Sequence, residues 1–277
     1  MSIVRCLSAA ALAVATSGAF AQAQPASKDF VPQVGQAGKD VIWVPTPEAL
    51  VERMLAMAKV TQSDFVMDLG SGDGRTVIAA AKKGATAMGI EYNPDMVALS
   101  QKNAATAGVG GKATFTKADL FETDLSKASV ITMYLLPDIN LRLRPKILNL
   151  KPGTRVVSHA FTMGDWEPDE RAEVEGRTAM LWIVPAKVEG DWSLKGPNSG
   201  AYDVALKQTY QKLSGTVRHG NATAQIEDGK VMGDSVQFTF VEGGKKSRFV
   251  GRANGNQLTG AIDGGATAQM NWSGMRK

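Results

Sequence analysis

One glycine-rich turn constrains the fold of this 277-residue chain more than any other segment. Residues 65–69 form an apolar run typical of a buried strand, and residues 75–83 favour a helix. The five residues between them, 70–74, are Gly-Ser-Gly-Asp-Gly. Glycines at such a turn let a ligand approach the backbone amides at the start of the helix. The segment therefore predicts a strand, a ligand-binding loop and a helix in succession.

The alternation of strands and helices continues on both sides of this turn. Apolar runs predict further strands at residues 86–92, 113–117, 129–135 and 154–161. Helical periodicity predicts helices after Thr46-Pro47, from Asn93-Pro94 to about 107, and over 139–150. Strands that alternate with helices at this spacing form a mostly parallel sheet with helices on both faces. We therefore expect a Rossmann-like α/β domain over residues 41–187.

The pattern changes at about residue 188, where the helical period ends. Short alternating stretches such as 236–240 are separated by pairs typical of hairpin turns, among them Asp228-Gly229 and Asn254-Gly255. About eight antiparallel strands fit this spacing, so residues 188–277 are predicted to form a small antiparallel β-barrel or sandwich. Trp192 and Trp272 are expected in its core.

The N-terminus has the features of an export signal. Arg5 precedes an apolar run over 7–15, and Ala19-Phe20-Ala21 is a small-x-small cleavage site. The run is shorter than the roughly 20 residues that span a bilayer, so no transmembrane segment is expected. We predict a signal peptide over residues 1–21, cleaved after Ala21, and export to the bacterial periplasm. Residues 22–40 are rich in Gln, Pro, Ala and Gly and are predicted to be a flexible lead.

The composition excludes several classes of site. Cys6 is the single cysteine and lies in the predicted signal, which excludes disulfides and thiolate metal sites from the mature chain. Two histidines about 60 residues apart, His159 and His219, do not suit a metal centre, and none is expected. The net charge of +4 comes from interspersed basic and acidic residues rather than a basic block. We therefore expect no nucleic-acid partner.

Two features of the turn distinguish between its possible cofactors. The dinucleotide fingerprint requires glycine or alanine at position 75, where this chain has Arg75, and its third glycine is Gly74 instead. Asp68 comes just before the loop, where its charge would repel a pyrophosphate and attract an ammonium or sulfonium group. These residues favour S-adenosylmethionine over a nicotinamide cofactor, and they disfavour a nicotinamide oxidoreductase.

Two more acids follow the next two predicted strands. Glu91 comes 21 residues after Gly70, where a carboxylate can accept hydrogen bonds from both ribose hydroxyls. Asp119 could accept from the adenine amine, with the Leu120 backbone amide donating to the ring. Because ligands of open α/β sheets bind at the carboxyl ends of the strands, we expect the three acids around one cofactor. Each acid taken alone could instead be a solvated loop carboxylate or a helix cap.

These motifs carry a resemblance to a known family. Asp-Leu-Gly-Ser-Gly-Asp-Gly-Arg at 68–75, Gly-Ile-Glu-Tyr-Asn-Pro at 89–94, Ala-Asp-Leu at 118–120 and Tyr-Leu-Leu-Pro at 134–137 resemble class I S-adenosylmethionine methyltransferases. With Val-Pro-Thr-Pro at 44–47 and Arg-Val-Val-Ser-His at 155–159, the chain resembles small protein-lysine methyltransferases related to the mitochondrial enzymes that modify the ATP-synthase c-ring protein and the adenine-nucleotide translocase. The resemblance covers about residues 41–187.

The resemblance and the residue analysis together give a set of predicted cofactor residues. They are Thr46, Asp68, Gly70, Ser71, Gly72, Asp73, Gly74, Glu91, Asn93, Asp119 and Leu120. The resemblance also implies a class I methyltransferase sheet and a segment 44–47 that closes over the cofactor.

Methyl transfer from a sulfonium mainly requires that the acceptor be positioned and water excluded. We predict that Tyr134, Leu136, Pro137 and His159 do this, through carbonyls at a strand end and a histidine that orients or deprotonates the acceptor. Alternatively, 134–137 is a buried strand end that stops at proline, and His159 is structural. The chain lacks the Asn/Asp-Pro-Pro-Tyr/Phe segment of other amine methyltransferases, so the acceptor is expected to be a protein lysine or another amine. A non-catalytic exported module that binds an adenosyl ligand or docks a protein is the alternative function.

Overall fold

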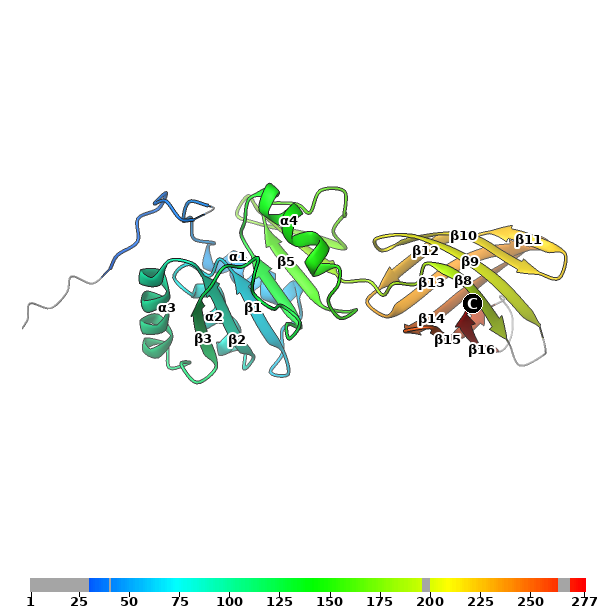
Figure 1. Ribbon diagram of the computed structural model, residues 1–277, viewed down its shortest axis with the longest axis horizontal. Coiled ribbons are helices and arrows are strands. Elements are labelled where there is room, and N and C mark those ends of the chain that lie inside the picture. Colours follow the sequence, from blue (N-terminus) through cyan, green and yellow to red (C-terminus); the bar gives the residue numbers. More distant parts are fainter. Residues whose placement is uncertain (1–29, 40, 196–199, 264–269) are drawn as a thin grey trace, which may run out of the picture. The chain divides into compact units, whose positions relative to one another are not determined.

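The computed structural model describes residues 30–39, 41–195, 200–263 and 270–277 (Figure 1). The predicted signal peptide, residues 1–21, lies outside these ranges. Within them, no helix is both long and apolar enough to cross a membrane.

Seven strands form the first sheet, in the order β3-β2-β1-β4-β5-β7-β6 (Figure 1). Their bounds are β1 Phe65–Leu69, β2 Thr86–Glu91, β3 Ala113–Lys117, β4 Val130–Met133, β5 Arg155–His159, β6 Glu170–Val174 and β7 Arg177–Ile183. β1 to β5 are parallel, and β7 pairs antiparallel with β5 and β6. The strand order reverses between β1 and β4, and ligands of such sheets bind at this point, beyond the carboxyl ends of the strands.

Four helices cover the two faces of this sheet. They are α1 Glu48–Met57, α2 Arg75–Lys82, α3 Pro94–Thr106 and α4 Pro137–Ile147. The helices α1, α2 and α3 pack in one apolar cluster with alternate strand residues such as Val66 and Val157. The helix α4 packs in a second cluster with the residues between them, such as Met67 and Val156. The predicted Rossmann-like sheet with helices on both faces is therefore confirmed.

The remaining strands close into an antiparallel barrel. They are β8 Gly190–Lys195, β9 Ala201–Thr209, β10 Lys212–His219, β11 Ala222–Gln225, β12 Glu227–Met232, β13 Ser235–Glu242, β14 Lys245–Asn254, β15 Gln257–Asp263 and β16 Met270–Arg276. The strand β8 pairs with both β9 and β16, and β10 pairs with β9 and β12, which closes a ring of eight strands. The short β11 pairs with β10 outside the ring. Of the two predicted architectures, the structure is thus a barrel, with Trp192 and Trp272 in its core as expected.

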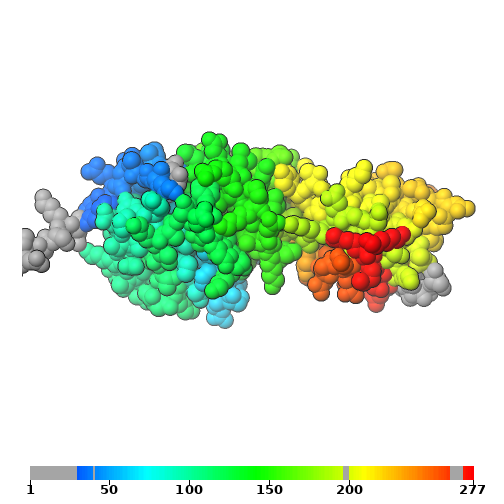
Figure 2. Space-filling view, viewed as in Figure 1, coloured from blue at the N-terminus to red at the C-terminus, as the bar shows by residue number. Residues whose placement is uncertain are grey.

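A small hairpin precedes α1. We call residues 35–39 and 41–43 the N-terminal hairpin. The Gly35 amide donates to the Trp43 carbonyl (2.9 Å), and the Trp43 amide donates to the Gln36 carbonyl (2.9 Å). The space-filling view shows this part of the chain, in blue, at the surface (Figure 2). Part of the segment that composition predicts to be a flexible lead thus forms paired backbone.

Candidate functional site

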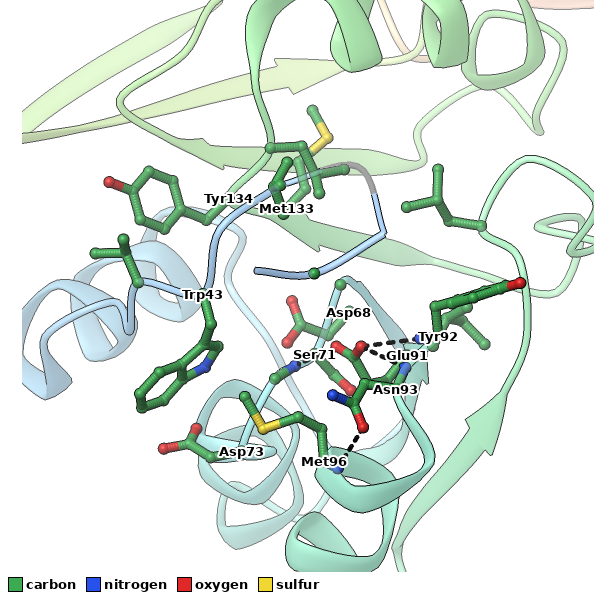
Figure 3. A pocket seen from close by; sticks show the side chains of 18 of the residues that line it. Trp43, Asp68, Ser71, Asp73, Glu91, Tyr92, Asn93, Met96, Met133 and Tyr134 are labelled. Carbon is green, nitrogen blue, oxygen red and sulfur yellow. Dashed lines mark hydrogen bonds between the residues drawn. The ribbon is translucent and has the colours of Figure 1, made fainter. Parts of the chain in front are cut away.

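A pocket opens at the carboxyl ends of β1, β2, β3 and β4 (Figure 3). The N-terminal hairpin, the glycine loop and the residues that follow β2, β3 and β4 supply most of its wall. All the predicted cofactor residues except Gly74 line it, and Tyr134 lines it too. Leu136, Pro137 and His159 are not on the wall. The sequence analysis did not single out Trp43, Arg75, Tyr92, Met96 and Met133, which also line the pocket.

The loop requires glycine for two different reasons. Gly72 has a φ of +54°, and a Cβ there would lie 2.7 Å from Trp43 Nε1, so a side chain would displace the indole that covers the loop. Gly74 has a φ of +82° and lies where a Cβ would collide with Phe115 and Ser100. Gly74 therefore allows α2 to pack closely against its neighbours, and it does not reach the pocket.

Glu91 connects the loop to the end of β2. Its Oε2 accepts from the Gly72 amide (3.0 Å), and its Oε1 accepts from the amides of Tyr92 and Asn93 (2.9 Å each). Three backbone donors thus fix the carboxylate before any ligand binds (Figure 3). Asn93 caps α3 by accepting from the Asp95 amide (2.8 Å).

Asp68 is the buried acid of the pocket. Burial raises the pKa of this carboxyl to about 7; the hydrogen bond from Thr132 (2.7 Å) opposes the rise, and the charges of Asp73 and Glu91 add to it. A buried carboxyl among other acids is best stabilised in its charged form by a cation. The site therefore suits a positively charged ligand.

Asp119, at the end of β3, is held by the N-terminal hairpin. Its Oδ2 accepts from Lys39 Nζ (2.5 Å), and its Oδ1 accepts from the Phe121 amide (2.8 Å). The hydrogen bond from Lys39 is the main cause of a lowered pKa for this carboxyl. The Lys39 ammonium also lies 4.7 Å from the centroid of the Tyr92 ring.

Tyr134 and His159 form a stacked pair at the opposite side of the pocket. Their ring centroids are 3.8 Å apart, and His159 Nδ1 lies 3.0 Å from Thr46 Oγ1. Burial, and secondarily the charge of Arg177, lowers the pKa of His159 to about 4, so the ring is neutral at pH 7. His159 therefore contacts two residues of the pocket wall without lying on it, an arrangement that fits the structural alternative. Leu136 and Pro137 begin α4, outside the pocket.

The residues present fit S-adenosylmethionine. A buried acid faces its cationic groups, a fixed carboxylate follows β2, and a third acid follows β3. The Ser71 hydroxyl in the loop is buried and has no hydrogen-bond partner, which leaves a polar atom for a ligand to satisfy. Within the described ranges, no group of three His, Cys, Asp or Glu side chains could hold a metal ion.

Comparison with known proteins agrees with this chemistry. The family model for the ANTKMT methyltransferase domain matches residues 68–170. A protein-lysine N-methyltransferase of Saccharolobus islandicus (strain REY15A) is 46% identical over 151 residues, which are 52% of this chain and 94% of that protein. The lysine N-methyltransferase of Homo sapiens that is named for the ATP-synthase c-ring protein is 38% identical over 128 residues, 46% of this chain and 54% of the human protein. The chain thus spans about half the length of the human relative.

Among solved structures, an RNA methyltransferase from Salinibacter ruber in complex with S-adenosyl-L-homocysteine matches with 50% identity and a TM-score of 0.51. The match covers 52% of this chain and 96% of that one. Together with the pocket geometry, these similarities show that the chain belongs to the ANTKMT-type family of methyltransferases and is an S-adenosylmethionine-dependent enzyme.

Proposed function

We propose that this enzyme methylates the side-chain amine of a lysine in a protein. The observation that carries the proposal is the 46% identity over nearly the whole length of a relative named as a protein-lysine N-methyltransferase. The human relative is also named for methylation of a lysine, in the ATP-synthase c-ring protein.

The end of β4 supports an amine acceptor. When bound, S-adenosylmethionine supplies an electrophilic methyl group, and the protein has to present a neutral amine to it. Met133, Tyr134 and Leu135 line the pocket there, and Met133 and Leu135 are buried. Apolar surroundings lower the pKa of an amine and so favour its neutral form. We expect backbone carbonyls at Tyr134 to Leu136 to orient it, because a carbonyl accepts from an N–H.

The lowered pKa of His159 bears on the proton. A lysine ammonium has an ordinary pKa of about 10.4, so a histidine with a pKa of about 4 is a very poor base for it. We infer that the acceptor amine loses its proton to water as it enters the apolar end of the pocket. His159 then supports Tyr134 and Thr46 rather than moving a proton.

The proposal is tested with methyl-labelled S-adenosylmethionine and the full chain. Envelope proteins and total RNA of a bacterial host are offered separately, since the Salinibacter relative is named as an RNA methyltransferase. We expect label in protein, located on lysine by mass spectrometry, and none with the variant Glu91→Ala. Label in RNA, or S-adenosylhomocysteine release with neither acceptor labelled, would overturn the lysine assignment.

We also propose that residues 1–21 direct export and are removed. The short apolar run and the Ala19-Phe20-Ala21 site support this proposal. Mass spectrometry of the protein from its native host, after separation of cytoplasm and periplasm, is expected to find Gln22 at the N-terminus in the periplasmic fraction. An intact N-terminus in the cytoplasm would contradict it.

A further inference from the structure

The charges of the cofactor and of the pocket can be compared group by group. S-adenosylmethionine carries a sulfonium, an ammonium and one anionic group, the carboxylate of its amino-acid end. Four acids line the pocket: Asp68, Asp73, Glu91 and Asp119. An unpaired carboxylate among these acids would be strongly disfavoured. The cationic side chains on the described wall are Lys39 and Arg75.

These two cations lie at different ends of the pocket. Lys39 donates to Asp119 after β3 and stacks on Tyr92, whereas Arg75 begins α2, directly after the glycine loop of β1. In Figure 3, Tyr92 lies on one side of Asp68, and Asp73, which binds Arg75, lies on the other. The strand order β3-β2-β1 assigns adenine and ribose to the side of Lys39. The amino-acid end therefore extends toward Arg75.

The guanidinium of Arg75 is held in a defined orientation. Its Nε lies 3.0 Å from Asp73 Oδ1, and its Nη2 lies 2.7 Å from Asp73 Oδ2. Its Nη1 donates to the Thr46 carbonyl (3.0 Å). Thr46 is fixed in turn by His159. The protein thus holds the cation from two directions.

This arrangement leaves donors for a ligand. A guanidinium has five N–H groups in a planar fork. Three are used by Asp73 and Thr46 in the described part of the chain, and the two that remain belong to Nη1 and Nη2. A pair of donors on neighbouring nitrogens matches the two oxygens of a carboxylate.

We propose that Arg75 binds the carboxylate of S-adenosylmethionine through Nη1 and Nη2, with Asp73 and the Thr46 carbonyl as the groups that orient it. Arg75 then makes the enzyme select a cofactor with an intact amino-acid end. The contact also joins the cofactor to the 44–47 segment through Thr46. The inference rests on the identity of the cofactor and does not depend on the acceptor.

The test compares two ligands with two proteins. Decarboxylated S-adenosylmethionine keeps the sulfonium and the ammonium and lacks only the carboxylate. We expect calorimetry on the wild-type full chain to show about 10- to 100-fold weaker binding of this ligand, as for the loss of hydrogen bonds between charged groups. In Arg75→Gln, S-adenosylmethionine should weaken by a similar factor while the decarboxylated ligand is unchanged. Arg75→Lys should recover part of the preference, because it keeps the charge without the fork.

Two controls make the outcomes decisive. Arg53→Gln removes an exposed arginine that pairs with Glu170 outside the pocket, and it should leave both affinities unchanged. If Arg75→Gln weakens both ligands equally, Arg75 only supports the loop and the proposal is wrong. Equal binding of both ligands by the wild type would also overturn it. Neither readout involves methyl transfer, so failure of the lysine proposal would leave this test intact.

Discussion

Asp68 makes cofactor binding depend on pH. Burial raises the pKa of its carboxyl to about 7, so below that pH the free protein holds a proton there. The positive groups of S-adenosylmethionine favour the charged form, so binding has to expel this proton. Affinity should fall by about tenfold for each pH unit below 7 and level off above it. Calorimetry near pH 6 in buffers of different ionisation enthalpy should detect the released proton.

The variant Asp68→Asn is the control for this effect. It should bind S-adenosylmethionine more weakly and lose the pH dependence. The sign for stability is opposite. The pKa of Asp68 is higher in the folded protein than the ordinary value of 3.8, so its contribution to stability is greatest at low pH and declines as pH rises through 7. Asp68→Asn should therefore raise the melting temperature at pH 8, and unchanged melting together with pH-independent wild-type binding would contradict the assignment.

Single residues show what the sequence could reveal about the site. Asp68, Glu91 and Asp119 could be located because each comes at the end of an apolar run, and parallel strands bring such ends together. Trp43 could not, because its position over Gly72 depends on how the N-terminal hairpin folds back. The Lys39–Asp119 hydrogen bond joins residues 80 positions apart, and no local pattern encodes that contact.

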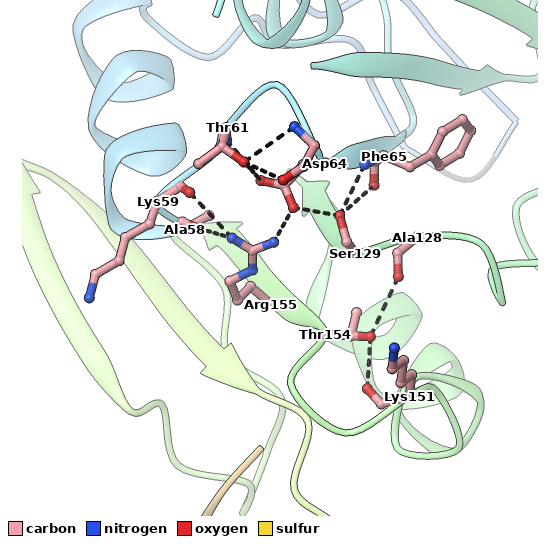
Figure 4. Close-up of polar contacts among 11 residues, drawn as sticks. Ala58, Lys59, Thr61, Asp64, Phe65, Ala128, Ser129, Lys151, Thr154 and Arg155 are labelled. Carbon is pink, nitrogen blue, oxygen red and sulfur yellow. Dashed lines mark hydrogen bonds and ion pairs between the residues drawn. The ribbon is translucent and has the colours of Figure 1, made fainter. Parts of the chain in front are cut away.

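At the scale of elements, Arg155 joins the end of α1 to three strands at the edge of the sheet opposite the pocket (Figure 4). It donates to the Ala58 carbonyl (2.7 Å) and to Asp64, which also accepts from Ser129 Oγ (2.8 Å). Arg155→Met leaves the buried Asp64 without its cation. We expect a loss of about 2–4 kcal/mol in the free energy of unfolding, less than for a fully buried pair because Arg155 is partly exposed.

Urea denaturation measures this loss. The exposed pair Arg53–Glu170 provides the matched control, and Arg53→Gln should cost about 0–1 kcal/mol. Adding Asp64→Asn to Arg155→Met should recover part of the stability, because the unpaired charge is removed. Equal losses for Arg155→Met and Arg53→Gln would show that the Arg155–Asp64 contact does not stabilise these elements.

The bounds of elements were predictable only where local chemistry fixes them. The strand predicted over 154–161 ends at His159, because Ala160 has a φ of +64° and leaves the extended conformation. The helix predicted from residue 139 begins at Pro137, whose fixed φ suits a first helical position. The pair β6 and β7 was not predicted, since β6 is a half-exposed edge strand with three charged residues in five.

At the scale of the whole molecule, closure of the barrel is what the sequence could not determine. Turn residues predict each hairpin locally, so about eight strands were foreseeable. A sandwich and a barrel have the same hairpins and differ in which distant strands pair. Here Arg276 of the last strand pairs with Trp192 of the first, a contact set by the accumulated twist of the sheet and by packing in its interior.

The barrel and the α/β sheet have separate apolar cores, so a defect in one should leave the chemistry of the other intact. Trp192 is fully buried in the barrel core, and none of that core lines the cofactor pocket. Trp192→Ala should lower the stability of the barrel by about 3–5 kcal/mol, the cost of removing a buried indole. The affinity for S-adenosylhomocysteine should not change. Trp182→Ala is the matched variant, because Trp182 packs in the same cluster as Leu69 and Leu135 beneath the pocket. It should weaken binding as well as stability. If calorimetry finds that Trp192→Ala reduces binding as much as Trp182→Ala, the barrel contributes to the cofactor site, and the two cores act as one.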